Sequence, residues 1–173
     1  MKYLKYFNTL FITCLVVIAF SQCSTAQKNT KSKNDSKKIF FKNIVDSQHF
    51  VFDAQSVNPL RGGFRNLTSP YDVRISKDTM ISYLPYFGRA YIATLNPSDA
   101  GLDFTSTNFS YTITPHKKNG WVVVIKPKDK TEIQQYLFTI YDNGSASLNV
   151  TSISRDAISF NGYIKNEEKK KTK

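Results

Sequence analysis

The stretch that decides the fold is residues 135–151, QYLFTIYDNGSASLNVT. Two runs of alternating apolar residues flank its Asn143-Gly144 pair: Tyr136, Phe138 and Ile140 before it, and Ala146, Leu148 and Val150 after it. A period of two is typical of a β-strand with one buried face. Asn-Gly accepts the positive φ angles of a two-residue turn. The stretch therefore predicts an antiparallel hairpin.

The same period of two recurs along most of the chain. Further alternating runs cover 50–54, 71–75, 109–113 and 158–164, and a second Asn-Gly pair precedes the Val-rich run 121–125. With Met80 after a Lys77-Asp78 turn, this makes about eight short strands, a number typical of a barrel or a sandwich. A meander of that size removes its exposed edges by closing. We therefore predict an all-β, antiparallel barrel in preference to a sandwich.

One short helix is expected before the barrel. Ile39, Phe40, Ile44 and Val45 follow Ser36 with a spacing of three to four residues, which indicates a helix. The expected organisation is a signal peptide at 1–26, a disordered basic linker at 27–38, a single β-barrel domain at 39–164 and a disordered basic tail at 165–173.

The first residues read as an export signal. Lys2 and Lys5 precede an uncharged apolar run at 10–20, and small residues follow it without a charge until Lys28. The apolar run is too short for a membrane span, which needs about 20 residues. The expected location is therefore outside the cytoplasm, as a periplasmic or membrane-anchored protein of a bacterial envelope.

Two cleavage sites remain open at the end of this signal. Ser24-Thr25-Ala26 fits ordinary signal peptidase and would leave Gln27 as the N-terminus of a soluble protein. Cys23 instead resembles the lipid-attachment cysteine of bacterial lipoproteins, although Gln22 departs from that pattern. The absence of cysteine from the chain after Cys23 favours the lipid anchor slightly, and it excludes a disulfide in the mature domain.

The net charge of +11 does not indicate a nucleic-acid partner. Ten of the 24 Lys and Arg residues lie in the segments 28–38 and 165–173, and two lie in the signal. Residues 39–164 hold 12 basic and 10 acidic residues, so the domain itself is nearly neutral. Terminal basic runs are typical of solvated, flexible ends.

The residue types that carry common catalytic chemistry are missing. The two histidines, His49 and His116, have no partner at a metal-ligand spacing, and no phosphate-binding, dinucleotide-binding or Gly-x-Ser-x-Gly motif occurs. Asp99 and Asp103 fit a turn better than a catalytic carboxylate pair. We therefore expect no enzyme activity, no metal and no cofactor.

Three segments without regular alternation carry a family resemblance. They contain the strings RGG at 61–63, YLPYFGRAY at 83–91 and GLDFTS at 101–106. With the closing residues 158–164, they are similar to an uncharacterised exported bacterial family known as domain of unknown function 4251, over nearly all of 49–164. The resemblance implies envelope proteins with lipoprotein-like leaders, a calycin-like (lipocalin-like) barrel and no assigned activity.

The same segments supply the candidate binding residues: Arg61, Arg65, Tyr86, Phe87, Arg89 and Tyr91. Loops on a rigid sheet carry recognition, guanidinium groups match carboxylate or phosphate oxygens, and aromatic faces add apolar contact. Two functions are consistent with them. One is a non-catalytic barrel that binds an anionic or amphiphilic small molecule or a lipid; the other is an envelope module that binds a protein through an exposed aromatic and arginine surface. A third interpretation is purely structural, in which these residues close the end of the barrel.

Overall fold

The computed structural model describes residues 26–91, 101–117 and 119–167. Residues 1–25 of the expected signal peptide, Cys23 among them, and the last part of the expected tail lie outside these residues. The chain divides into two compact units, Met1–Ser36 and Lys37–Lys173. The second unit contains the whole sheet.

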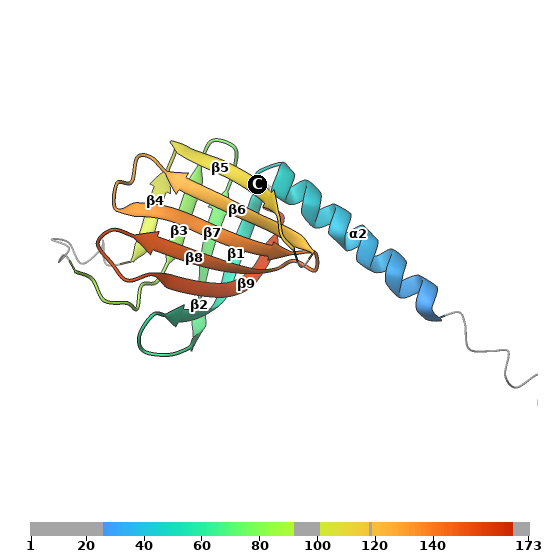
Figure 1. The fold of residues 1–173 in the computed structure, drawn as a ribbon, viewed down its shortest axis with the longest axis horizontal. Coiled ribbons are helices and arrows are strands. Elements are labelled where there is room, and N and C mark those ends of the chain that lie inside the picture. The colour runs from blue at the N-terminus through green and yellow to red at the C-terminus, as the bar shows by residue number, and fades with distance from the viewer. Residues whose placement is uncertain (1–25, 92–100, 118, 168–173) are drawn as a thin grey trace, which may run out of the picture. The chain divides into compact units, whose positions relative to one another are not determined.

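Nine antiparallel strands form one nearly closed barrel, preceded by one helix (Figure 1), so the all-β prediction is confirmed. In Figure 1 the strands β5 to β9, yellow to red, cross over the strands β1 to β4, and the core lies between the two layers. The sheet order is β4-β3-β2-β1-β9-β8-β7-β6-β5. The strands are β1 (Phe50–Pro59), β2 (Arg65–Ile75), β3 (Met80–Leu84), β4 (Leu102–Ser106), β5 (Phe109–Pro115), β6 (Gly120–Pro127), β7 (Ile133–Tyr141), β8 (Ser145–Ser152) and β9 (Ile158–Lys165).

The two ends of the sheet, β4 and β5, meet at a corner held by Asp129. The Ser106 hydroxyl donates to one carboxylate oxygen of Asp129 at 2.5 Å, and the Thr107 amide donates to the other at 3.0 Å. These bonds, led by the one from Ser106, hold the pKa of Asp129 below its usual value. The corner lets the chain pass from one layer to the other without a β4–β5 ladder.

Two segments differ from the expectation. Residues 102–106 form the ninth strand, β4, because they pair with β3 from Met80 opposite Ser106 to Leu84 opposite Leu102. Residues 58–68, which lack regular alternation and for that reason suggest a long loop, are mostly strand, because β1 continues to Pro59 and β2 begins at Arg65. A bulge at Ala54/Ser56 shifts the register of β1 against both neighbours and lets the two strands extend past it.

The helix α2 covers Ala26–Asp46 and so begins well before the expected position. The segment expected as a disordered linker at 27–38 is helical in the structure. Lys and Gln are good helix formers, so a helix there needs no apolar stripe. Near its end, Ile44 and Val45 are buried, whereas Ile39 and Phe40 are exposed. The Tyr111 hydroxyl donates to the Val45 carbonyl at 2.9 Å and joins this end to β5.

The interior of the barrel is filled by side chains. Five aromatic residues are completely buried: Phe50, Phe52, Tyr136, Phe138 and Phe160. The Phe138 ring meets the edges of two others, with centroids 5.9 Å from Phe50 and 5.6 Å from Phe52. Edge-to-face packing of this kind adds stability beyond the apolar area it buries. The barrel thus has an aromatic core where a lipocalin-like barrel would hold a ligand.

Candidate functional site

The aromatic segment after β3 is held against the β8–β9 connection. Ala90 and Arg155 form an isolated antiparallel bridge, the Tyr91 amide donates to the Ser154 carbonyl at 2.8 Å, and the Asp156 amide donates to the Arg89 carbonyl at 3.0 Å. These two hydrogen bonds, which form the bridge, give a segment with no regular strand a defined position. They bring residues 89–91 beside residues 154–156, some 65 residues later in the chain.

Asp156 is the centre of this contact. Its side chain is only 3% exposed, and one carboxylate oxygen accepts a hydrogen bond from the Tyr91 hydroxyl. The other oxygen has no hydrogen-bond partner among the described residues, and the Arg61 Nε atom lies 4.0 Å from it. The hydrogen bond to Asp156 is the main cause that raises the pKa of Tyr91. Asp156 is thus a buried carboxylate with one oxygen that accepts no hydrogen bond from the described residues, next to the exposed side chain of Arg61.

The Tyr86 side chain contacts both segments of this bridge. Its hydroxyl oxygen lies 2.9 Å from the Arg89 carbonyl oxygen and 3.0 Å from that of Asp156. Its one proton is therefore shared between the carbonyl oxygens of the two segments. The Arg155 guanidinium lies 5.3 Å from the centre of the Tyr86 ring and donates to the Gly101 carbonyl at 3.1 Å. Burial, followed by the Asp156 charge, raises the pKa of Tyr86.

The structure places four of the six candidate residues around Asp156. Arg61 and Tyr91 approach its carboxylate, and the Tyr86 hydroxyl and the Arg89 carbonyl contact its backbone. The other two residues, Arg65 and Phe87, pair with each other, with the guanidinium carbon 5.2 Å from the ring centre. The Arg89 side chain is exposed, and the hydrogen bonds of this residue to Tyr86 and Asp156 are made by its carbonyl.

Sequence reasoning missed Arg155 and Asp156, which are 7% and 6% exposed. The signal that could have found them is the gap in alternation between Val150 and Ile158, where two charged residues interrupt an otherwise apolar and polar pattern. Nothing local in that gap indicates burial, because burial comes from the distant segment 85–91.

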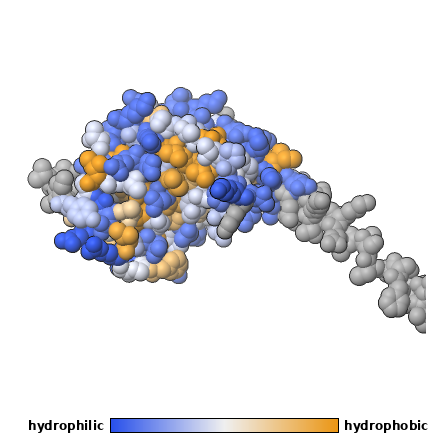
Figure 2. Space-filling model, in the orientation of Figure 1, coloured by the Kyte–Doolittle hydropathy of each residue, from blue (hydrophilic) through white to orange (hydrophobic). Residues whose placement is uncertain are grey.

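Around this contact lies an exposed surface of apolar and arginine side chains, which we call the rim surface. It consists of Leu60, Arg61, Phe64, Arg65, Phe87, Arg89, Tyr91 and Ile153. Leu60 is 66% exposed, and Phe64, Tyr91 and Ile153 are each 61% exposed. Figure 2 shows that hydrophobic residues lie between hydrophilic ones on one face of the molecule. Exposed aromatic and arginine side chains together are typical of binding surfaces.

The histidines lie apart from this surface. His49 forms an ion-pair contact with Glu167 at 3.2 Å, and the His116 ring meets the edge of Tyr141 at 5.7 Å. In the part of the chain that the structure describes, no group of three or more His, Cys, Asp or Glu residues is placed to hold a metal ion. None of the described helices combines the length and the apolar character that crossing a membrane requires.

The comparisons with known proteins concern family and fold. No curated protein matches this chain. A crystal structure of a DUF4251 family protein from Bacteroides eggerthii DSM 20697 is 13% identical and has a TM-score of 0.54, over 76% of this chain and 88% of that chain. At that identity the likeness shows the fold alone. The family model described as domain of unknown function, DUF4251, matches residues 28–164, and the chain therefore belongs to the DUF4251 family.

Proposed function

We propose that this protein is a non-catalytic docking module of a bacterial envelope, which binds an acidic segment of a partner protein on its rim surface. The observation that carries the proposal is the exposure of four large apolar side chains at 61% or more beside three exposed arginines: Leu60, Phe64, Tyr91 and Ile153, with Arg61, Arg65 and Arg89. Exposed apolar area of this kind favours association, because binding removes it from water.

The filled interior favours a surface site over an internal one. Phe50, Phe52, Tyr136, Phe138 and Phe160 occupy the space in which a ligand-carrying barrel would hold its ligand. A small anionic or amphiphilic ligand would have to bind on the rim surface instead, where the apolar side chains are open to solvent. A protein segment covers such a surface better than a small molecule does.

Charge complementarity indicates an acidic partner. Arg61, Arg65 and Arg89 present guanidinium groups, which match carboxylates with two parallel hydrogen bonds. The acidic side chain that contacts the rim surface within the described residues, Asp156, is already engaged by Tyr91. A second copy of this chain would bring the same three positive charges, and their repulsion disfavours a symmetric rim-to-rim dimer.

The expected export signal supports the location that the proposal includes. Anchoring through an acylated Cys23 would hold the domain at a membrane surface within reach of envelope proteins, whereas cleavage before Gln27 would release it. The test is the substitution Cys23→Ser in the native host, followed by fractionation. Movement of the protein from the membrane fraction to the soluble fraction supports the anchor, and an unchanged distribution contradicts it.

Docking is tested by photo-crosslinking in living cells. A photoreactive phenylalanine analogue is placed at Phe64 or Tyr91, and for the control at Ile81, which is 40% exposed on β3. We expect one discrete crosslinked protein from both rim positions and none from the control. The double substitution Arg61→Glu and Arg65→Glu should abolish that product, because it reverses the charge that an acidic segment needs.

Two results would contradict docking. One is a crosslinked product that appears equally from Ile81, because it would report general proximity. The other is a reproducible acidic small molecule released from native protein, with no crosslinked protein at the rim positions. That second result would support the small-ligand function on the same residues.

A further inference from the structure

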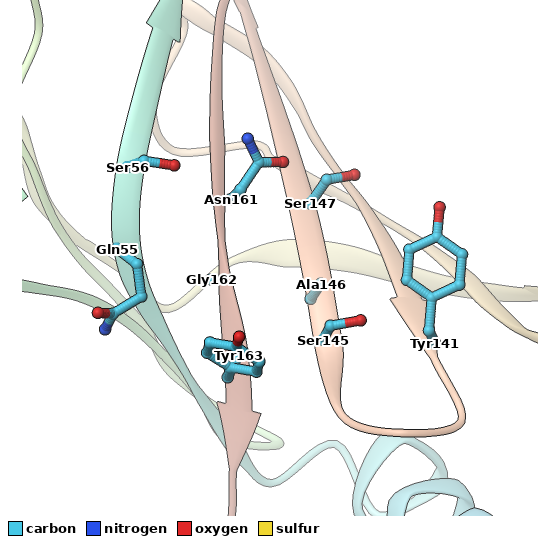
Figure 3. Close-up of a pocket in the computed structure, with 9 residues that line it drawn as sticks. All are labelled: Gln55, Ser56, Tyr141, Ser145, Ala146, Ser147, Asn161, Gly162 and Tyr163. Atoms are coloured by element: carbon cyan, nitrogen blue, oxygen red, sulfur yellow. The ribbon is translucent and has the colours of Figure 1, made fainter. Parts of the chain in front are cut away.

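A groove on the outer wall of the barrel lies across four neighbouring strands, β1, β9, β8 and β7. Its volume is about 430 Å³, and its wall includes Ser56, Ser147 and Asn161 with the rings of Tyr141 and Tyr163 (Figure 3). None of these residues belongs to the rim surface. Ala146 and Gly162, which also line it, are buried, whereas their neighbours Asn161 and Tyr163 are exposed on the outer face.

The register of the sheet sets polar side chains in rows across the groove. Ser56 pairs with Asn161, Asn161 pairs with Ser147, and Ser147 pairs with Thr139. The adjacent row contains Tyr163 opposite Ser145. Because paired residues of neighbouring strands share a face, these side chains form one continuous outer surface.

The residues that line the groove carry no charge, and the carboxylate of Asp53 lies at its edge, opposite Tyr163 and bonded to the Gln55 amide at 3.2 Å. All nine residues that line the groove are uncharged, in a chain with 37 charged side chains from Lys, Arg, Asp and Glu. The charged residues nearest along β1 and β9 are Asp53 and Lys165, which pair with each other at 2.9 Å. Outer faces of sheets commonly carry charged residues for solubility, so a row of hydroxyl and amide groups needs another explanation.

The side chains of the central row lack hydrogen-bond partners among the described residues but differ in exposure: Ser56 is buried, Ser147 is partly buried and Asn161 is exposed. Within the described residues, the side chains of Ser56, Asn161 and Ser147 make no hydrogen bond to one another or to any other group. The next row differs, because the Asn149 amide donates to the Ser159 hydroxyl at 3.0 Å. Ser147 and Asn161 thus keep donors and acceptors available to a ligand, whereas Asn149 and Ser159, outside the groove, bond to each other.

Two tyrosine rings complete the groove. Tyr163 on β9 and Tyr141 on β7 stand on opposite sides of Ser145, as Figure 3 shows. Tyr163 is 59% exposed. A Tyr ring offers an apolar face and a polar hydroxyl at low cost in side-chain entropy, and both are useful in recognition of a ligand that is itself part apolar and part polar.

We propose that this groove binds a segment of a neutral oligosaccharide. Sugar hydroxyls donate and accept hydrogen bonds, as do the Ser hydroxyls and the Asn amide of the central row. The C–H faces of sugar rings are apolar and fit the exposed Tyr163 ring and the partly exposed Tyr141 ring. A charged ligand would find no opposite charge among the lining residues. A peptide strand would find no free sheet edge, because β9 and β8 pair with a strand on both sides.

The test uses the mature chain and three neutral hexasaccharides as probes: cellohexaose, maltohexaose and chitohexaose. Titration calorimetry measures binding to the unmodified protein and to Tyr163→Ser and Ser147→Val, which remove one ring and one hydroxyl. We expect at least one probe to bind, and each variant to weaken it by about tenfold, because a lost stacking contact or hydrogen bond is worth about that much.

The matched control is Tyr83→Ser, since Tyr83 is 48% exposed on β3, away from the groove. Its affinity for the probe should equal that of the unmodified protein. If a groove variant fails to fold, amide chemical-shift mapping of the unmodified protein replaces it, and shifts should concentrate at residues 145–149 and 159–163. No binding of any probe at millimolar concentration, or binding that leaves both groove variants and these amides unaffected, overturns the proposal.

Discussion

The Tyr136 and Ser82 hydroxyls lie 3.0 Å apart in the centre of the barrel, where both residues are completely buried. The Ser82 hydroxyl donates its one proton to the Leu102 carbonyl at 2.7 Å, so Tyr136 must be the donor to Ser82. These residues lie on β7 and β3, which are not neighbours in the sheet. The bond therefore spans the interior and ties the two layers together.

This chain of hydrogen bonds predicts an asymmetry between two substitutions. Tyr136→Phe removes the outer donor and leaves Ser82 bonded to Leu102, so it should lower the free energy of unfolding by about 1 kcal/mol. Ser82→Ala leaves the Tyr136 hydroxyl buried without a partner, and it should cost about 2 kcal/mol. Urea unfolding of both variants and of the double variant measures the coupling. Equal costs for the two single variants would contradict the donor assignment.

The opposite faces of β8 predict opposite tolerance to a carboxylate. Leu148 is completely buried, so Leu148→Asp should lower the free energy of unfolding by more than about 3 kcal/mol. Asn149, the next residue, lies on the outer face, and Asn149→Asp should change stability by less than about 1 kcal/mol. Thermal unfolding of the pair measures the difference. A similar loss for both would argue against the strand alternation on which the fold rests.

The buried Tyr136 and the partly buried Tyr111 predict loss of stability in base. Burial raises the pKa of Tyr136 and of Tyr111 above the ordinary value of 10.0, and the Asp46 charge adds to the shift at Tyr111. Below pH 10 these groups are protonated in the folded and the unfolded chain, and their contribution to stability is complete. Above it the unfolded chain loses their protons first, so the free energy of unfolding falls as pH rises.

The slope should reach at most about 1.4 kcal/mol per pH unit for each of these tyrosines. Urea unfolding at a series of alkaline pH values measures it. Tyr136→Phe and Tyr111→Phe should each reduce the slope, because each variant lacks one group that titrates differently in the two states. A slope unchanged in both variants would show that other groups cause the alkaline loss.

The contacts around Asp156 predict that different groups of the segment 85–91 stabilise the fold and bind a partner. Tyr86→Phe removes the hydroxyl between the Arg89 and Asp156 carbonyls. It should cost about 1 kcal/mol of stability and speed hydrogen exchange at the Tyr91 and Asp156 amides. Arg89→Ala keeps the carbonyl and removes only an exposed side chain.

Arg89→Ala should therefore leave the melting temperature unchanged and weaken an acidic partner by about 2 kcal/mol, as expected for a charge-assisted hydrogen bond. Calorimetry with the identified partner measures the affinity, and circular dichroism measures the melting temperature. A large drop in melting temperature without any change in binding would assign Arg89 to closing the barrel end.

Much of the fold follows from the sequence because alternation is a local property. Tyr136, Phe138 and Ile140 were predicted to share a face, and all three are completely buried. A turn also forms at the predicted place, but three residues, 142–144, connect the strands: the Gly144 amide donates to the Tyr141 carbonyl at 3.0 Å, and Gly144, unlike Asn143, has a positive φ, 88°. Strand β4 was missed, because residues 102–106 alternate weakly and become a strand by pairing with β3.

The candidate sites depended much more on the tertiary structure. The exposed arginines and aromatics of the rim surface were visible in the sequence, because loops that break the alternation are visible there. Asp156, which organises them, was not visible, because its burial depends on a segment some 65 residues earlier. The outer groove was equally hidden, since its central row combines Ser56, Ser147 and Asn161 from three strands.

The sequence by itself thus determined the strands, their buried faces and most of their turns, because a residue's place in a period of two depends only on its neighbours in the chain. The tertiary structure decided which strands are adjacent and in which register, and therefore which side chains share a surface. Those choices rest on hydrogen bonds and packing between residues far apart in sequence, such as Ser82 and Tyr136, and no local pattern encodes them.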